Sequence, residues 1–151
     1  QDAGIYARQS ERLDRCVQIG VAGDRVLAVS FPERPDDGAG TDHRLLDRID
    51  AYLDGEPDAF EDVVVALTVP TDRRAVLQTL RDVPYGEQVS VEQLTRMTPG
   101  LDPEAAADRR LVETALSENP APLLLPGHRV RDGPSSAPSG VVRRLRETER
   151  L

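Results

Sequence analysis

Proline and glycine divide this chain into short segments, which limits the folds open to it. The sequence has 12 Pro and 11 Gly in 151 residues. Because Pro cannot continue a helix and Gly favours turns, the stretches between them can form only short helices or strands. None of these stretches approaches the roughly 20 apolar residues needed to cross a bilayer. We therefore expect a soluble, cytoplasmic protein with no membrane partner. The clearest breaks fall at Pro32–Gly40, Pro70-Thr71, Pro84-Tyr85-Gly86, Thr98-Pro99-Gly100 and Asn119-Pro120.

The first 70 residues carry the apolar pattern of a small α/β lobe. Apolar residues alternate on both sides of a Gly-Asp turn, which predicts a β-hairpin. Apolar residues at helical spacing, and then a short apolar run, predict a helix and a buried strand. These elements are a hairpin over Cys16–Phe31 with its turn at Gly23-Asp24, a helix capped by Thr41 or Asp42 and ending near Leu53, and a strand over Val63–Leu67.

The remaining residues, 71–151, indicate a helical domain, and we place the boundary between the two parts at Pro70-Thr71. Each expected helix begins at a residue that can cap it, and one of them has the spacing of a capping box. The expected helices begin at Thr71 or Asp72, at Ser90 with Gln93 three residues later, at Asp102 with Pro103 in the first position and an end near Glu118, and at Val141.

Two of these helices, Ser90–Met97 and Pro103–Glu118, are separated only by a tight turn containing Gly100. This arrangement suits a helix-turn-helix, in which the second helix enters a DNA groove. A plain helical hairpin packed in a core would give the same pattern, so the spacing alone leaves both interpretations open.

Charge is distributed unevenly along the chain. All 19 basic residues are Arg, Asp outnumbers Glu by 16 to 11, and the net charge is -8. Residues 1–70 carry 11 Asp and 4 Glu against 7 Arg, whereas residues 71–151 carry 5 Asp and 7 Glu against 12 Arg. A polyanion such as DNA is therefore repelled by the first part and tolerated by the second. The lysine-free, Asp-rich composition is typical of a halophile, although high genomic GC content would also favour Arg over Lys.

Few residues could bind a metal or form a disulfide. Cys16 is the single cysteine, and His43 and His128 are the only histidines. We therefore expect no disulfide framework, no metal site and no cofactor.

The most specific signal is the string from Asn119-Pro120 through the apolar run to Pro126-Gly127-His128-Arg129-Val130. It resembles the active-site signature of the alkylguanine-DNA alkyltransferases (methylated-DNA-protein-cysteine methyltransferases). The resemblance continues upstream at Pro84-Tyr85-Gly86 and downstream from Ser139-Gly140 to Leu145 and Glu149. It covers residues 71–151 and implies a DNA-binding domain with a helix-turn-helix.

The resemblance also implies roles for single residues. Arg110 corresponds to the arginine that fills the base stack when a nucleotide is flipped out, and flipping is needed because the reactive atom of guanine is buried in the stack. His128 and Glu149 correspond to a proton relay, with Glu147 as an alternative carboxylate. The implied partners are duplex DNA containing alkylated guanine and other repair proteins. The implied DNA-binding residues are Arg109, Arg110, Asn119, Gly127, Arg129, Ser139 and Gly140.

Gly127 departs from the family pattern because it stands where the reactive cysteine is expected. Alkyl transfer needs a thiolate, so we expect no catalytic nucleophile at this site. The sequence is in this respect similar to the alkyltransferase-like proteins, which lack the cysteine and flag lesions for repair. Further departures are Val91 and Pro138 in place of tyrosines, and Asp108 and Arg109 in place of small residues.

Non-enzymatic recognition of alkylated guanine in duplex DNA, by base flipping and in DNA repair, is therefore the function that the sequence favours. Two alternatives remain. The first is a methyltransferase whose cysteine was mutated to Gly127, and the second is an interaction protein that has lost DNA binding. His128 also has a purely structural interpretation, and Arg110 could be an ordinary solvated residue of its helix.

Overall fold

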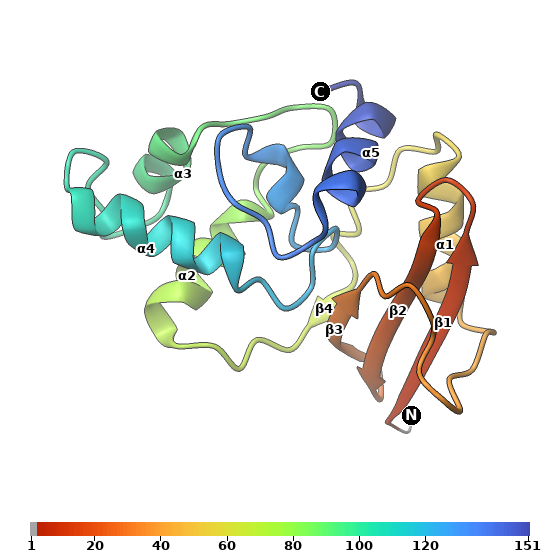
Figure 1. Cartoon of the computed structure of the whole chain (residues 1–151). Coiled ribbons are helices and arrows are strands. Elements are labelled where there is room, and N and C mark those ends of the chain that lie inside the picture. Colours follow the sequence, from red (N-terminus) through yellow and green to blue (C-terminus); the bar gives the residue numbers. More distant parts are fainter. Residues whose placement is uncertain (1–2) are drawn as a thin grey trace.

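The computed structural model describes residues 3–151 and combines a four-stranded sheet with five α-helices (Figure 1). This confirms the expected α/β fold class. The strands are β1 (Gly4–Ser10), β2 (Arg15–Ala22), β3 (Arg25–Ser30) and β4 (Val64–Val65). They lie in sequence order: β1, β2 and β3 are antiparallel, and β4 is parallel to β3.

The predicted hairpin is confirmed as β2 and β3. Gly23 lies in the turn between them with a φ of 64°, a left-handed conformation that glycine adopts without steric cost. A register shift at Gly20/Val21 interrupts the pairing of the two strands. The sequence analysis did not identify β1, which pairs with β2 along its whole length.

Helix α1 (Arg44–Leu53) places five side chains in the core: Leu45, Leu46, Ile49, Tyr52 and Leu53. Thr41 and Asp42, the expected caps, lie before its N-terminus. His43 takes that position, and its Nδ1 accepts a hydrogen bond from the Leu45 N–H.

The second half contains α2 (Thr71–Leu80), α3 (Val91–Met97), α4 (Ala106–Ser117), α5 (Ser139–Glu149) and the short 3₁₀ helix η1 (Gly127–Arg129). Helices α2, α3 and α4 pack against one another. The capping box is confirmed at α3, where Ser90 and Gln93 satisfy each other's backbone N–H groups.

In the second half of the chain, three more helix starts differ from the prediction. The N-cap of α2 is Pro70, so Thr71 lies within the helix. Helix α4 begins at Ala106, because the Asp102 carboxylate accepts the Glu104 N–H and holds a separate turn there. Helix α5 begins at Ser139, two residues before Val141.

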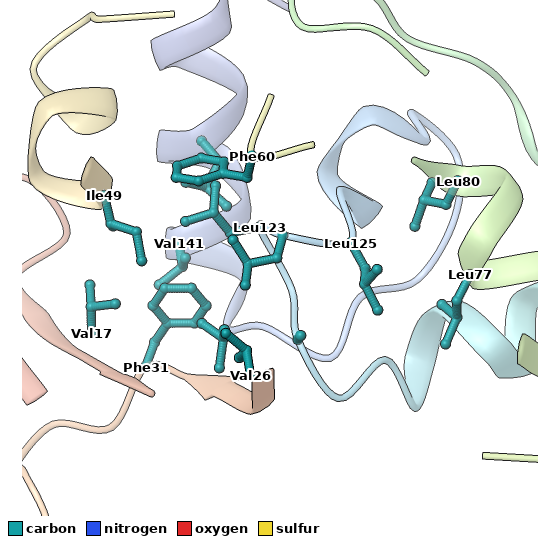
Figure 2. Close-up of a cluster of buried hydrophobic side chains, with 14 of the residues drawn as sticks. Val17, Val26, Phe31, Ile49, Phe60, Leu77, Leu80, Leu123, Leu125 and Val141 are labelled. Carbon is teal, nitrogen blue, oxygen red and sulfur yellow. The ribbon is translucent and has the colours of Figure 1, made fainter. Parts of the chain in front are cut away.

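A single hydrophobic core joins the two halves of the chain. Figure 2 shows Val17, Val26 and Phe31 from the sheet side facing Leu123 and Val141 from the second half. Because this cluster is continuous, the two halves share a core. Their division at residue 70 stays a prediction. Within residues 3–151, no helix has both the length and the apolar character that a membrane span requires.

Candidate functional site

The loop after α4 is held in shape by one buried side chain, Asn119. Its Oδ1 accepts the Ala121 N–H at 2.9 Å, and its Nδ2 donates to the Leu125 carbonyl at 2.8 Å. Leu123 adopts a positive φ of 86° within this turn. The two bonds compensate for that conformation and fold the apolar run inward, so residues 121–130 are all buried. The loop leads directly into η1.

Glu149, near the end of α5, accepts hydrogen bonds from four residues in three parts of the chain. His128 Nε2 lies 2.6 Å from Oε2, and Arg129 binds both carboxylate oxygens at 2.9 and 3.1 Å. The Gly86 N–H donates to Oε1 at 3.0 Å, and the Tyr52 hydroxyl donates to Oε2. We call these five residues the Glu149 cluster. A buried carboxylate with this many donors satisfies its hydrogen-bonding capacity without water.

The surroundings of Glu149 and His128 determine the charges of these two residues. Burial disfavours the ionised form of Glu149, but hydrogen bonds from His128 and Arg129 outweigh it and hold its pKa at about 2. Burial lowers the pKa of His128 despite its bond to Glu149. His128 is therefore neutral at pH 7 and donates from Nε2, which leaves Nδ1 as an acceptor. Within residues 3–151, this buried Nδ1 has no hydrogen-bond partner.

These pKa shifts predict acid sensitivity. The stability contributed by Glu149 is present above its unfolded pKa of about 4.5 and is lost as the pH falls towards 2, by on the order of 3 kcal/mol. The lowered pKa of His128 adds a loss that begins below about pH 6.5. Urea titrations between pH 7 and pH 3 should therefore give a steadily falling free energy of unfolding. A flat profile would contradict the buried, ionised Glu149.

Glycine is not required by the fold at position 127. Its φ lies outside the left-handed region, so an L-residue fits the backbone. A Cβ at this position would meet Asn119 Nδ2 at 3.6 Å and Leu116 Cδ2 at 3.9 Å, which are ordinary contacts. Cys16 cannot take its place from β2, because its thiol is buried against Gln9 and the Glu33 carbonyl.

The exposed face of α4 carries Arg110 together with Ala106 and Ala107. Arg109 is half-buried and donates to the Pro103 carbonyl, while Asp108 accepts the Asp102 N–H. Asp108 and Arg109 therefore support the turn before α4, and small residues occupy the exposed first turn of the helix.

Apart from the half-buried Arg109, the expected DNA-binding residues fall into an exposed and a buried group. Arg110, Ser139 and Gly140 are exposed, the latter two in the first turn of α5. Asn119 and Gly127 are buried. Arg129 is 3% exposed, and its remaining nitrogen Nη1 donates to the Val83 carbonyl, so its expected contact with DNA is not supported. Its guanidinium instead neutralises Glu149.

Sequence reasoning missed Tyr52 and Gly86. Tyr52 reaches Glu149 across 97 positions of sequence, and its position within the apolar pattern of α1 gives no sign of a polar partner. Gly86 contributes only its backbone N–H, and the pattern of side chains in a sequence cannot predict such a contact.

A cavity of about 540 Å³ lies beside α5, lined in part by Ser135, Ser139, Arg143 and Arg146. Gly127 is not among its lining residues. In the part of the chain that the structure describes, no group of three or more His, Cys, Asp or Glu side chains is placed to hold a metal ion.

Comparison with known proteins gives consistent results. Residues 71–147 match the family model described as the DNA binding domain of 6-O-methylguanine DNA methyltransferase. A methylated-DNA–protein-cysteine methyltransferase of Methanopyrus kandleri is 32% identical over 108 residues, which are 70% of this chain and 77% of the relative. A protein of the same name from Metallosphaera sedula is 34% identical over 86 residues, 57% of this chain and 51% of the relative.

Solved structures agree in fold. The Mycobacterium tuberculosis O6-methylguanine methyltransferase matches with a TM-score of 0.72 and 22% identity, covering 97% of this chain and 92% of that one. A structure of the Mycobacterium tuberculosis protein in complex with DNA matches with a TM-score of 0.73 and 21% identity, covering 98% of this chain and 91% of that one. The O6-methylguanine-DNA methyltransferase of Pyrococcus kodakaraensis matches with a TM-score of 0.61 and 20% identity, covering 99% of both chains.

Proposed function

Because this chain belongs to the 6-O-methylguanine DNA methyltransferase family, we propose that it binds alkylated guanine in duplex DNA without accepting the alkyl group itself. The feature that supports this proposal is Gly127, which stands where the resemblance places the family's cysteine, in a loop whose other residues are held in place. Asn119 still shapes that loop, and the Glu149 cluster still supports η1 behind it. The scaffold is thus retained while the nucleophile is missing.

The proposed DNA-binding surface is the helix pair α3 and α4, acting as a helix-turn-helix. Three observations support it: α3 and α4 pack together, Arg110 extends from the exposed face of α4, and the neighbouring exposed residues are alanines. Small residues allow a helix to approach DNA closely, and an arginine beside them can replace a base that has been flipped out. Ser139 and Gly140, at the start of α5, are the proposed contacts with the flipped base.

Binding titrations test this proposal with matched duplexes that contain either guanine or O6-methylguanine. We expect tighter binding to the duplex with the lesion. Equal affinity for both duplexes would contradict lesion recognition, and the absence of binding to either would favour an interaction protein that has lost DNA binding.

Arg110→Ala should weaken lesion binding by about 1–3 kcal/mol, the scale of one stacking contact. Arg143→Ala, which replaces an exposed arginine of α5, should reduce the binding free energy by less. Arg12→Ala, which removes the same charge from the first half of the chain, controls for net charge. A larger loss for Arg143→Ala than for Arg110→Ala would contradict the placement of DNA on α4.

Salt dependence provides a separate prediction. Counterion release gives a log–log slope of about -0.9 for each phosphate neutralised. Because residues 71–151 carry no net charge and residues 1–70 repel DNA, we expect a shallow slope that corresponds to about two to four phosphates. Titration of affinity against potassium chloride up to molar concentration measures it. A steep slope would contradict an interface that relies on uncharged contacts.

The acidic first half also underlies the proposal that the protein works at high salt. Its carboxylates repel one another in dilute buffer, and salt screens this repulsion. Thermal stability should therefore rise between dilute and molar potassium chloride. Full stability in dilute buffer would contradict the proposal.

A further inference from the structure

The cavity of about 540 Å³ beside α5 is, apart from Ser139, unused by the proposed lesion-binding surface. Its walls are the loop that leads into α5 and one face of that helix (Figure 1). The polar and charged side chains that line it are Ser135, Ser139, Arg143, Arg146 and Glu147. Two hydroxyls and two guanidinium groups therefore border one cavity with a single acidic side chain. This excess of donors suits a ligand that is rich in acceptors.

Neither arginine of this cavity forms an ion pair with a carboxylate among residues 3–151. Arg146 donates from Nε and Nη2 to two uncharged backbone carbonyls, both at 2.9 Å. Arg143 is exposed, and Glu147, four residues later on the same helix, contacts Arg144 at 3.5 Å instead. In a chain with 27 acidic residues and 19 arginines, two arginines without a carboxylate partner beside one cavity favour an anionic ligand.

The donors are held in place before a ligand arrives. The two bonds of Arg146 fix its guanidinium group and leave Nη1 without a partner among residues 3–151. The Ser135 hydroxyl accepts the Ala137 N–H at 3.0 Å, so its own hydrogen remains available for donation. The loop is packed tightly, since a Cβ at Gly133 would lie 2.8 Å from Leu116 Cδ1 of α4. A ligand therefore meets a preformed set of donors.

We propose that this cavity binds a phosphate group. Guanidinium groups bind phosphate through charge-assisted hydrogen bonds, and the two serine hydroxyls donate to its other oxygens. Glu147 opposes an anion, but its contact with Arg144 offsets its charge. Two sources offer this chemistry, the DNA backbone and a small phosphate compound. The inference goes beyond the proposed function, because it does not depend on recognition of the alkylated base.

The first test titrates the full chain with inorganic phosphate, at an ionic strength held constant with potassium chloride, and follows the backbone amides by NMR. We expect saturable shifts at Ser135, Ser139 and Arg143. Arg143→Ala should weaken the phosphate affinity about fivefold, the upper range for an exposed ion pair. Arg150→Ala removes the same charge from an exposed residue that does not line the cavity, and should leave the affinity unchanged. Absence of saturable shifts in the wild type, or equal losses in the two variants, would overturn the inference.

Glu147→Gln tests the sign of the effect. This change removes the carboxylate from the cavity and releases Arg144 from its contact. Phosphate should therefore bind about twofold more tightly, the scale of one exposed charge pair. An unchanged or weaker affinity would overturn the assignment of the phosphate to this cavity.

Binding to an unmodified duplex identifies the source of the phosphate. If the DNA backbone supplies it, Arg143→Ala should lower the log–log salt slope by about 0.9, the value for one phosphate. An unchanged slope, with inorganic phosphate still bound by the wild type, would assign the cavity to a small phosphate compound. Loss of affinity for neither duplex nor inorganic phosphate in Arg143→Ala would overturn the inference.

The same titrations with a duplex that contains O6-methylguanine separate this inference from the proposed function. Arg143→Ala should weaken binding to both duplexes by the same factor, because a phosphate contact carries no information about the base. Lesion preference without a phosphate site would overturn this inference alone. A phosphate site without lesion preference in the wild type would overturn the proposed function alone.

Discussion

Duplex DNA with a labelled methyl group on guanine O6, incubated with this protein in the absence of added thiol, should leave the protein unlabelled. The reason is chemical: position 127 carries no side chain, and alkyl transfer requires a thiolate. The free cysteine, Cys16, is buried in β2 against Gln9. Label is followed by mass spectrometry of the intact protein and of its peptides.

The matched variant is Gly127→Cys. A Cβ at this position would make only ordinary contacts, and the Glu149 cluster is in place nearby. We expect this variant, unlike the wild type, to take up label in a ratio approaching one per chain. Stoichiometric label on the wild-type protein would contradict the proposed function. An unlabelled Gly127→Cys variant would show that further differences from the expected family pattern, such as Val91 and Pro138, also prevent transfer.

Glu149→Ala should cost about 3–5 kcal/mol of folding free energy, because it leaves a buried arginine without its counter-ion. Tyr52 and His128 lose their acceptor at the same time. Urea unfolding measures the loss. Glu147→Ala is the control: this exposed residue of the same helix pairs with Arg144 at 3.5 Å and should change the free energy by less than about 1 kcal/mol. Similar losses for the two variants would contradict the cluster's structural role.

Features determined by neighbouring residues could be predicted from the sequence. The hairpin depends on a local turn at Gly23, and the start of α3 depends on Ser90 and Gln93, three residues apart. Both were predicted correctly. The start of α4 was wrong because two local arrangements compete there. Asp102 can cap a helix, but its carboxylate binds the Glu104 N–H in a separate turn.

Features determined by distant residues could not be predicted. Strand β1 has Arg8 and Gln9 within it, and pairing with β2 rather than its own composition defines it. The motif located Arg129 correctly in the sequence but could not show the direction of its side chain. That direction depends on Glu149, 20 residues later, and on the Val83 carbonyl, 46 residues earlier.

The Glu149 cluster also determines which mutations the protein can accumulate. The backbone at position 127 accepts glycine or an L-residue, and a Cβ there would make only ordinary contacts, so the fold does not dictate which residue stands there. Glu149 has the opposite property, because its replacement leaves Tyr52, His128 and Arg129 without their shared acceptor. Several substitutions would have to occur together to remove it. A lineage that abandons alkyl transfer can therefore discard the reactive residue in one step, yet keep the Glu149 cluster for reasons of folding. In such a protein, the presence of the cluster says nothing about whether transfer chemistry persists.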